Sequence, residues 1–118
     1  MTLVIVHYHL RPGGIRRVIE QAAPYLVRGS PRRVTRVVLL IGQRADPDWE
    51  SQFTQPLDGV TVEIIVEPTF NYLSEQRATP RRITVRIRRV LDSLFAVATP
   101  ADFIVWAHNL GVGRNLIL

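Results

Sequence analysis

The sequence predicts a single α/β domain built around a mostly parallel sheet, and three observations support this fold class. Short apolar runs rich in β-branched residues alternate with longer segments whose apolar residues recur at helical spacing. Glycine and proline residues separate these segments. The length of 118 residues fits one domain that buries its own core.

The predicted elements follow one another as strand, helix, strand, short helix, strand, helix, strand and helix. The strands are expected at residues 2–7, 34–41, 60–66 and 102–107. The helices are expected at residues 15–28, near 48–53, from the Thr79-Pro80 cap to residue 98, and from within 111–118. Right-handed crossovers then give a Rossmann-like open sheet with strand order 3-2-1-4 and helices on both faces.

Three features of the sequence affect the predicted lengths and types of the helices. Pro24 lies inside the first helical pattern and is expected to kink or shorten that helix, because proline has no backbone N–H. Residues 83–87 also alternate like a strand, but the length of the apolar stripe and the preceding cap favour a helix. The chain stops in apolar residues 116–118 soon after the last helix starts, which indicates a fragment of a longer protein.

Composition limits the cellular compartments and the binding partners that are expected for the protein. The absence of cysteine excludes disulfides and thiolate metal sites. The N-terminus has no signal-peptide pattern, and no apolar run approaches the ~18 residues that a membrane span requires. These observations favour a cytoplasmic protein, peripheral to the inner membrane face if it contacts a membrane. The net charge of +5 favours anionic partners.

All fifteen basic residues are arginines, and two explanations stay open. One is the codon bias of a GC-rich genome; the other is recognition of phosphate or carboxylate by the guanidinium fork. Five arginines fall in the late helix, where they form a solvated face or attach to anionic lipid. These are Arg81, Arg82, Arg86, Arg88 and Arg89. Specific nucleic-acid binding is not expected, because aromatic residues do not alternate with the arginines.

The predicted topology places two polar loops at one edge of the sheet. In open parallel sheets, ligands bind beyond the carboxyl ends of the strands where the strand order reverses, here between the first and fourth strands. Residues 7–14 (HYHLRPGG) and residues 108–115 (HNLGVGRN) both follow those strands. His108 therefore stands where a side chain reaches the crevice, and is either functional or a satisfied, partly buried histidine.

Gly13-Gly14 begins the first helix, where two explanations are equally open. Free N–H groups and the helix dipole favour an anion, and glycine lets that anion approach closely. The pair also suits a simple tight turn with positive φ. The spacing is not GxGxxG, so a standard dinucleotide site is not expected.

Metal binding is not predicted. His7 and His9 are two residues apart and could in principle join His108 on a metal, but no carboxylate or fourth ligand is evident. Asp46-Pro47-Asp48 resembles a metal-binding DxD, although its position in a polar loop favours a turn and a helix start.

Two segments in order, GGIRRVIEQAAPYL after the first strand and DFIVWAH followed by NLGVGRN, resemble the N-terminal domain of GT-B glycosyltransferases, family 4 in particular. The likeness covers nearly the whole chain. It implies two Rossmann-like domains facing across a cleft, the first receiving the acceptor and the second holding most of the nucleotide-sugar. It also implies retention of anomeric configuration, with no cofactor beyond the nucleotide-sugar donor.

The resemblance also implies roles for individual residues. Gly13 and Gly14 would lie near the donor diphosphate, and His108, as the catalytic residue, near the donor sugar. The other residues of the two loops expected to bind substrate are His9, Arg11, Asn109, Arg114 and Asn115. Because the nucleotide-sugar domain is not within these 118 residues, the chain by itself is expected to be inactive.

The expected partners follow from these interpretations. They are a nucleotide-sugar and a sugar or lipid-linked acceptor, together with an anionic membrane surface and a second copy of the chain bound through an exposed strand edge. The alternative function is a stand-alone Rossmann-like module that binds a phosphorylated ligand without catalysis.

Overall fold

The computed structural model describes residues 1–96, 99–108, 110, 115 and 117, and contains the predicted parallel sheet. Its strands are β1 (Thr2–His7), β2 (Arg36–Ile41), β3 (Thr61–Val66) and β4 (Phe103–Ala107). They pair in parallel in the order β3-β2-β1-β4. The α/β fold class and the strand order 3-2-1-4 are therefore confirmed.

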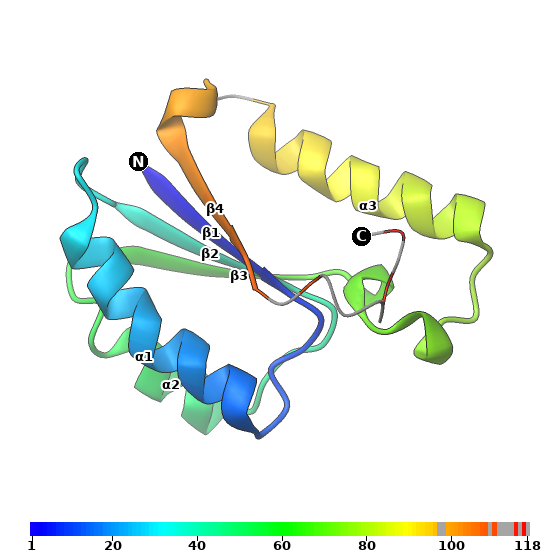
Figure 1. Ribbon diagram of the computed structural model, residues 1–118, viewed down its shortest axis with the longest axis horizontal. Helices are drawn as coiled ribbons and strands as arrows, with labels where there is room; N and C mark the ends of the chain where they lie inside the picture. Colours follow the sequence, from blue (N-terminus) through cyan, green and yellow to red (C-terminus); the bar gives the residue numbers. More distant parts are fainter. Residues whose placement is uncertain (97–98, 109, 111–114, 116, 118) are drawn as a thin grey trace.

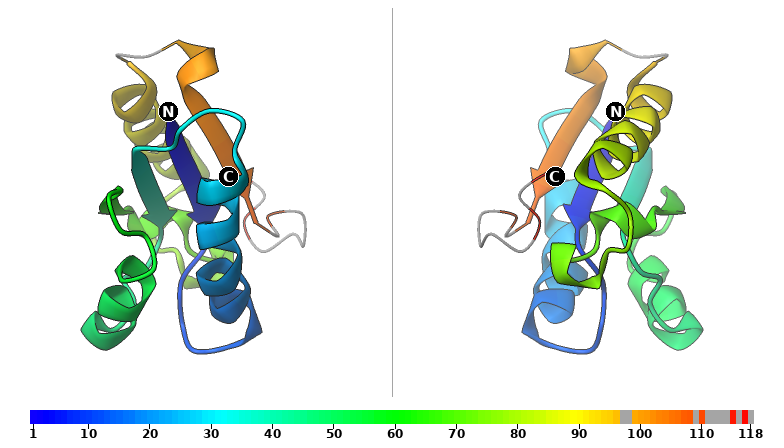
Figure 2. Two further views of the ribbon diagram at one scale, coloured as in Figure 1. Left: turned by 90° about the vertical axis from the view of Figure 1, so that its left-hand side faces the viewer. Right: turned by 90° about the vertical axis from the view of Figure 1, so that its right-hand side faces the viewer.

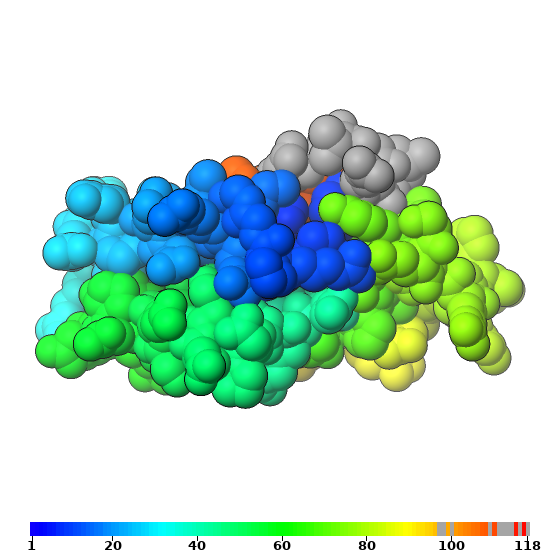
Figure 3. All heavy atoms as spheres, turned by 90° about the horizontal axis from the view of Figure 1, so that it is seen from below, coloured from blue at the N-terminus to red at the C-terminus, as the bar shows by residue number. Residues whose placement is uncertain are grey.

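Helices cover both faces of the sheet, as predicted. They are α1 (Gly14–Gly29), α2 (Pro47–Thr54) and α3 (Pro80–Phe95). Short 3-10 turns occupy Pro68–Phe70, Leu73–Glu75 and Pro100–Asp102. Helices α1 and α2 lie on one face and α3 on the other (Figures 1 and 2). Figure 3 shows α1, in blue, beside α2, in green, on their shared face.

The sheet separates two apolar cores. Side chains alternate along β1, so Leu3 and Ile5 pack beneath α1 and α2, whereas Val4 and Val6 pack beneath α3. Burial on both faces explains why the central strands are continuously apolar. The helix residues that close the cores are Ile19 and Ala23 on α1, Trp49 and Phe53 on α2, and Ile83, Ile87 and Leu94 on α3.

Helix α1 differs from its prediction. It continues through Pro24 to Gly29 over 16 residues, so the expectation that Pro24 would shorten it is wrong. Pro24 is buried together with Ile19 and Ala23, and this packing against the sheet holds both halves of the helix despite the missing N–H. Tertiary burial has overridden a local helix-breaking signal.

The remaining elements match their predictions closely. Thr79 caps α3 by accepting a hydrogen bond from the Arg82 N–H at 3.4 Å, and residues 83–87 are helical, as favoured. The short helix expected near 48–53 is α2. Strand β2 begins two residues later than expected, and β3 and β4 one residue later. The helix expected within 111–118 falls mostly outside the described residues.

Within the described part of the chain, no helix combines the length and the apolar character needed to cross a bilayer.

Candidate functional site

The carboxyl ends of the parallel strands bring three histidines together between β1 and β4. His7 is the last residue of β1, and His108 follows β4 and extends the ladder by donating its N–H to the Val6 carbonyl at 3.0 Å. The His7 ring centre lies 5.8 Å from that of His108 and 5.9 Å from that of His9. The first residues of the two predicted loops, His7 and His108, therefore meet at the point where the strand order reverses.

His7 presents a neutral imidazole in a fixed tautomer. Its Nδ1 lies 2.9 Å from the His108 carbonyl oxygen, so Nδ1 carries the proton and donates. Burial lowers the pKa of His7 below its ordinary value and favours the neutral ring. Its Nε2 is buried and has no hydrogen-bond partner among the described residues. Within the described structure, this nitrogen is therefore an acceptor without a donor at the candidate site.

An aromatic cluster flanks the histidines. The Tyr72 ring meets the His9 ring edge-on at 5.0 Å and the Tyr8 ring at 5.1 Å. Partial burial, followed by the charge of nearby Arg11, lowers the pKa of His9. The Tyr8 hydroxyl donates to the Leu110 carbonyl at 2.8 Å, which ties the segment after β4 to the end of β1.

Arg11 is held by an acidic partner. Its two terminal nitrogens bond the two carboxylate oxygens of Glu75 at 2.9 Å each, and its Nε donates to the Gln43 side chain at 2.9 Å. Hydrogen bonding to Arg11 lowers the pKa of Glu75 and keeps it ionised. The charge of Arg11 is thus neutralised locally, and its expected role in substrate binding stays a prediction.

The Gly13-Gly14 start of α1 is open. Gly13 adopts a φ of +157°, which residues with side chains rarely adopt. No side chain among the described residues caps this end of the helix, and its first turn holds no acidic residue. The free N–H groups line a hollow of ≈ 310 Å³ together with Arg16, Arg17 and Glu20. This geometry suits an anion, and the positive φ equally suits a tight turn.

Contacts among the described residues do not join Gly13 or Gly14 to the histidine cluster. The two features share an edge of the sheet because α1 begins after β1, but they form separate parts of it.

Asn115 is buried and fully used in backbone contacts. Its side-chain amide donates to the carbonyls of Thr69 at 2.9 Å and Asn71 at 2.8 Å, and its Oδ1 accepts from the Ile117 N–H. It thereby fastens the segment after β4 to the connection between β3 and α3. Its predicted contact with substrate stays untested, and Asn109 and Arg114 lie outside the described residues.

Gly42 and Asn71 hold the backbone in place at the carboxyl edge of the sheet, and neither residue was predicted to do so from the sequence. The Gly42 N–H donates to the Tyr8 carbonyl at 2.8 Å, and the Asn71 amide donates to the Gly42 carbonyl at 3.2 Å. A Cβ on Gly42 would lie 2.4 Å from the Asn71 nitrogen and 2.6 Å from the Tyr8 oxygen. The position of Gly42 directly after a buried strand was the available signal.

Asp46 acts as a helix cap, as favoured over a metal ligand. Its carboxylate accepts from the Trp49 N–H at 2.9 Å and pairs with Arg16 at 2.6 Å. Across the described ranges, no three histidine, aspartate or glutamate side chains are placed to share a metal ion. Comparisons of the chain with protein-family models, curated proteins and solved structures found no match.

Proposed function

We propose that this chain is the acceptor-side part of a retaining GT-B glycosyltransferase, which moves a sugar from a nucleotide-sugar to an acceptor. One observation carries the proposal: two polar, glycine-containing loops follow β1 and β4 at the edge where the strand order reverses, and His108 stands at the end of β4. The resemblance of both loops to those of GT-B enzymes supports the same function.

In this proposal the open start of α1 binds the donor diphosphate. The N–H groups after Gly13 have no side-chain cap in the described structure, and the first turn carries no carboxylate to repel phosphate. His108 acts near the donor sugar. Because the nucleotide-sugar domain of such enzymes follows the acceptor domain, residues 1–118 alone are expected to bind the donor weakly and to transfer no sugar.

A charge substitution at the helix start tests this role. We expect Gly14→Asp to abolish binding of UDP-glucose, measured by calorimetry, because the new carboxylate repels the diphosphate. The fold should tolerate the change: a Cβ at Gly14 meets nothing within 4 Å, and an acidic residue stabilises the start of a helix.

Gly29→Asp is the matched control, since it adds the same charge in open space at the other end of α1. Binding that survives Gly14→Asp, or that falls equally in both variants, contradicts the proposed diphosphate site. In a longer protein that includes a following α/β domain, His108→Ala should strongly reduce turnover while leaving folding intact.

The second candidate is a non-catalytic module for a phosphorylated ligand. The hollow beside Gly13, lined also by Arg16, Arg17 and Glu20, favours it because a small phosphate would fit there beside two arginines and without the histidines. Pyrophosphate that binds as tightly as UDP-glucose, with no change in the His108 signals, would favour this candidate over the glycosyltransferase.

A further inference from the structure

Helix α3 carries an exposed basic surface on the side away from the sheet. Ile83, Ile87 and Leu94 bury its inner side. On the outer side, Val85 is 50% exposed. Four exposed arginines precede and follow Val85 at spacings of three and four residues, so they are attached along the outer half of the helix. We call this set the α3 basic surface: Arg81, Arg82, Val85, Arg88 and Arg89.

The arginines of this surface are not held in ion pairs within the described structure. Elsewhere in the described chain, five arginines pair with a carboxylate (Arg11, Arg16, Arg32, Arg36 and Arg44), and four that are scattered over the surface do not (Arg17, Arg28, Arg33 and Arg77). On α3, Arg86 pairs with Glu67 at 2.9 Å, but the four arginines of the α3 basic surface have no acidic partner among the described residues. Asp92 is the one acidic residue of this helix. Four positive charges are therefore concentrated on one exposed surface.

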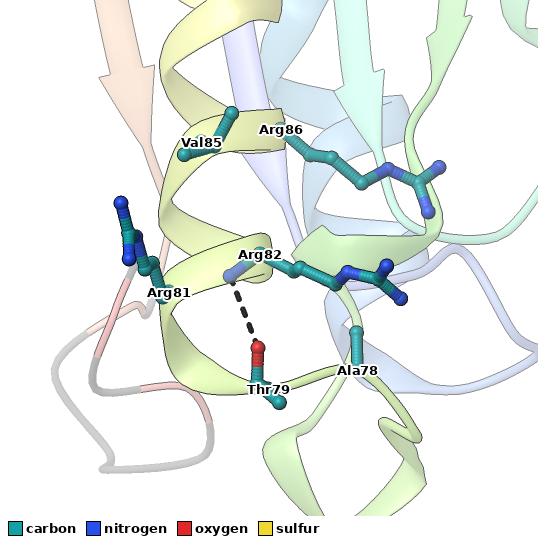
Figure 4. A pocket seen from close by; sticks show the side chains of 6 residues that line it. All are labelled: Ala78, Thr79, Arg81, Arg82, Val85 and Arg86. Atoms are coloured by element: carbon teal, nitrogen blue, oxygen red, sulfur yellow. Dashed lines mark hydrogen bonds between the residues drawn. The ribbon is translucent and has the colours of Figure 1, made fainter.

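A hollow adjoins this surface at the start of α3. It measures ≈ 590 Å³ and is lined by Ala78, Thr79, Arg81, Arg82, Val85 and Arg86. In Figure 4 the side chains of Arg82 and Arg86 extend to one side of the helix and that of Arg81 to the other. The Arg82 N–H is already bonded to the Thr79 hydroxyl at 3.4 Å, so we attribute the attraction for anions mainly to the guanidinium groups.

This combination of groups suits an anionic amphiphile. Guanidinium groups bind phosphate oxygens two at a time, and the apolar side chains of Ala78 and Val85 suit the hydrocarbon beneath a lipid headgroup. Free phosphate would gain nothing from the apolar lining. Single-stranded nucleic acid would lack aromatic side chains on which to stack its bases, since none lines the hollow.

We propose that the α3 basic surface binds the surface of a membrane rich in anionic phospholipid. This inference does not depend on the proposed function. Helix α3 begins at the carboxyl end of the sheet (Figure 1), so a membrane bound here would lie toward the end of the molecule that carries the candidate site.

Vesicle sedimentation tests the proposal. The chain should bind vesicles of phosphatidylcholine containing about one-third phosphatidylglycerol, and should not bind vesicles of phosphatidylcholine alone. Binding should weaken as salt rises from about 0.1 M to about 0.5 M, because exposed charges are screened. Equal binding to both vesicles, or binding unaffected by salt, would overturn the proposal.

Paired substitutions locate the contact. Arg81→Gln/Arg82→Gln should reduce the affinity for the anionic vesicles about 30-fold, from ~1 kcal/mol for each arginine. Arg32→Gln/Arg33→Gln is the matched control, because it removes the same charge from two adjacent exposed arginines before β2. An equal loss in both double variants would show attraction by net charge alone and would refute a specific surface.

A variant that gains affinity excludes misfolding as the cause of any change in vesicle binding. Asp92 lies two turns beyond Val85 on the same side of α3, so Asp92→Asn should increase the affinity for the anionic vesicles several-fold. Unchanged affinity counts against the proposal. Polyuridylate that displaces the chain from the vesicles at low concentration would identify nucleic acid as the preferred partner and would also overturn it.

Discussion

Several arginines near the candidate site are paired with carboxylates, whereas most of those on α3 are not; Arg17 and Arg28 of α1 are also unpaired among the described residues. Near α1 and α2, Arg11, Arg16 and Arg44 each contact a carboxylate within 2.9 Å. On α3, four arginines contact none among the described residues. The net charge of +5 is therefore unevenly distributed. One residue type links loops near the candidate site and forms an open cationic surface on the other face.

The carboxyl edge depends most on close backbone packing, and breaking that packing should have the largest effect. Gly42→Ala places a Cβ against the backbone of Tyr8 and Asn71 and should lower the free energy of unfolding by about 3 kcal/mol. Gly29→Ala, which meets nothing within 4 Å, should be neutral or slightly stabilising. Urea unfolding measures both, and a Gly42→Ala protein as stable as the parent would show that the edge is loosely packed.

Much of this architecture follows from patterns in the sequence. Apolar β-branched runs separated by helical stripes predicted the parallel sheet, and the topology then predicted that His7 and His108 would meet. The neutralisation of Arg11 could not be predicted, because Glu75 lies 64 residues away in a segment with no periodic pattern. The continuity of α1 was missed because it depends on the burial of Pro24, a property of the assembled fold.

His7, at the carboxyl edge, should make the stability of the fold depend on pH. Burial lowers the pKa of His7 below its ordinary value of 6.5, so the unfolded chain binds a proton more readily than the folded chain. The contribution of neutral His7 to the free energy of unfolding should be fully present above pH 6.5, and the protein should become less stable as the pH falls below that value. His7→Asn keeps an N–H near the position of Nδ1 but does not titrate, so its unfolding midpoint should vary less with pH. The same pH dependence in both proteins would rule out His7 as the cause.

Removing the Glu75 carboxylate should leave Arg11 unpaired, as the α3 arginines are, with little loss of stability. Glu75→Gln frees Arg11, whose ion pair is partly exposed at 41% and 35%, so the free energy of unfolding should change by less than ~1 kcal/mol. Affinity for UDP-glucose should rise, because a cation is released near the candidate site. Glu50→Gln, which frees Arg44 on α2, is the control for added charge. A large loss of stability in Glu75→Gln would mean that this pair holds the fold and does not merely neutralise Arg11.

The most direct measurement is a map of amide shifts during titration of the ¹⁵N-labelled chain with UDP-glucose. In this titration the carboxyl edge of the sheet and the α3 basic surface compete for the same diphosphate. The largest shifts are expected at Gly13, Gly14 and His108, with small shifts along α3. Shifts concentrated at Arg81 and Arg82 would contradict this account, because they would show that the diphosphate is attracted by the unpaired arginines and not by the carboxyl edge of the sheet.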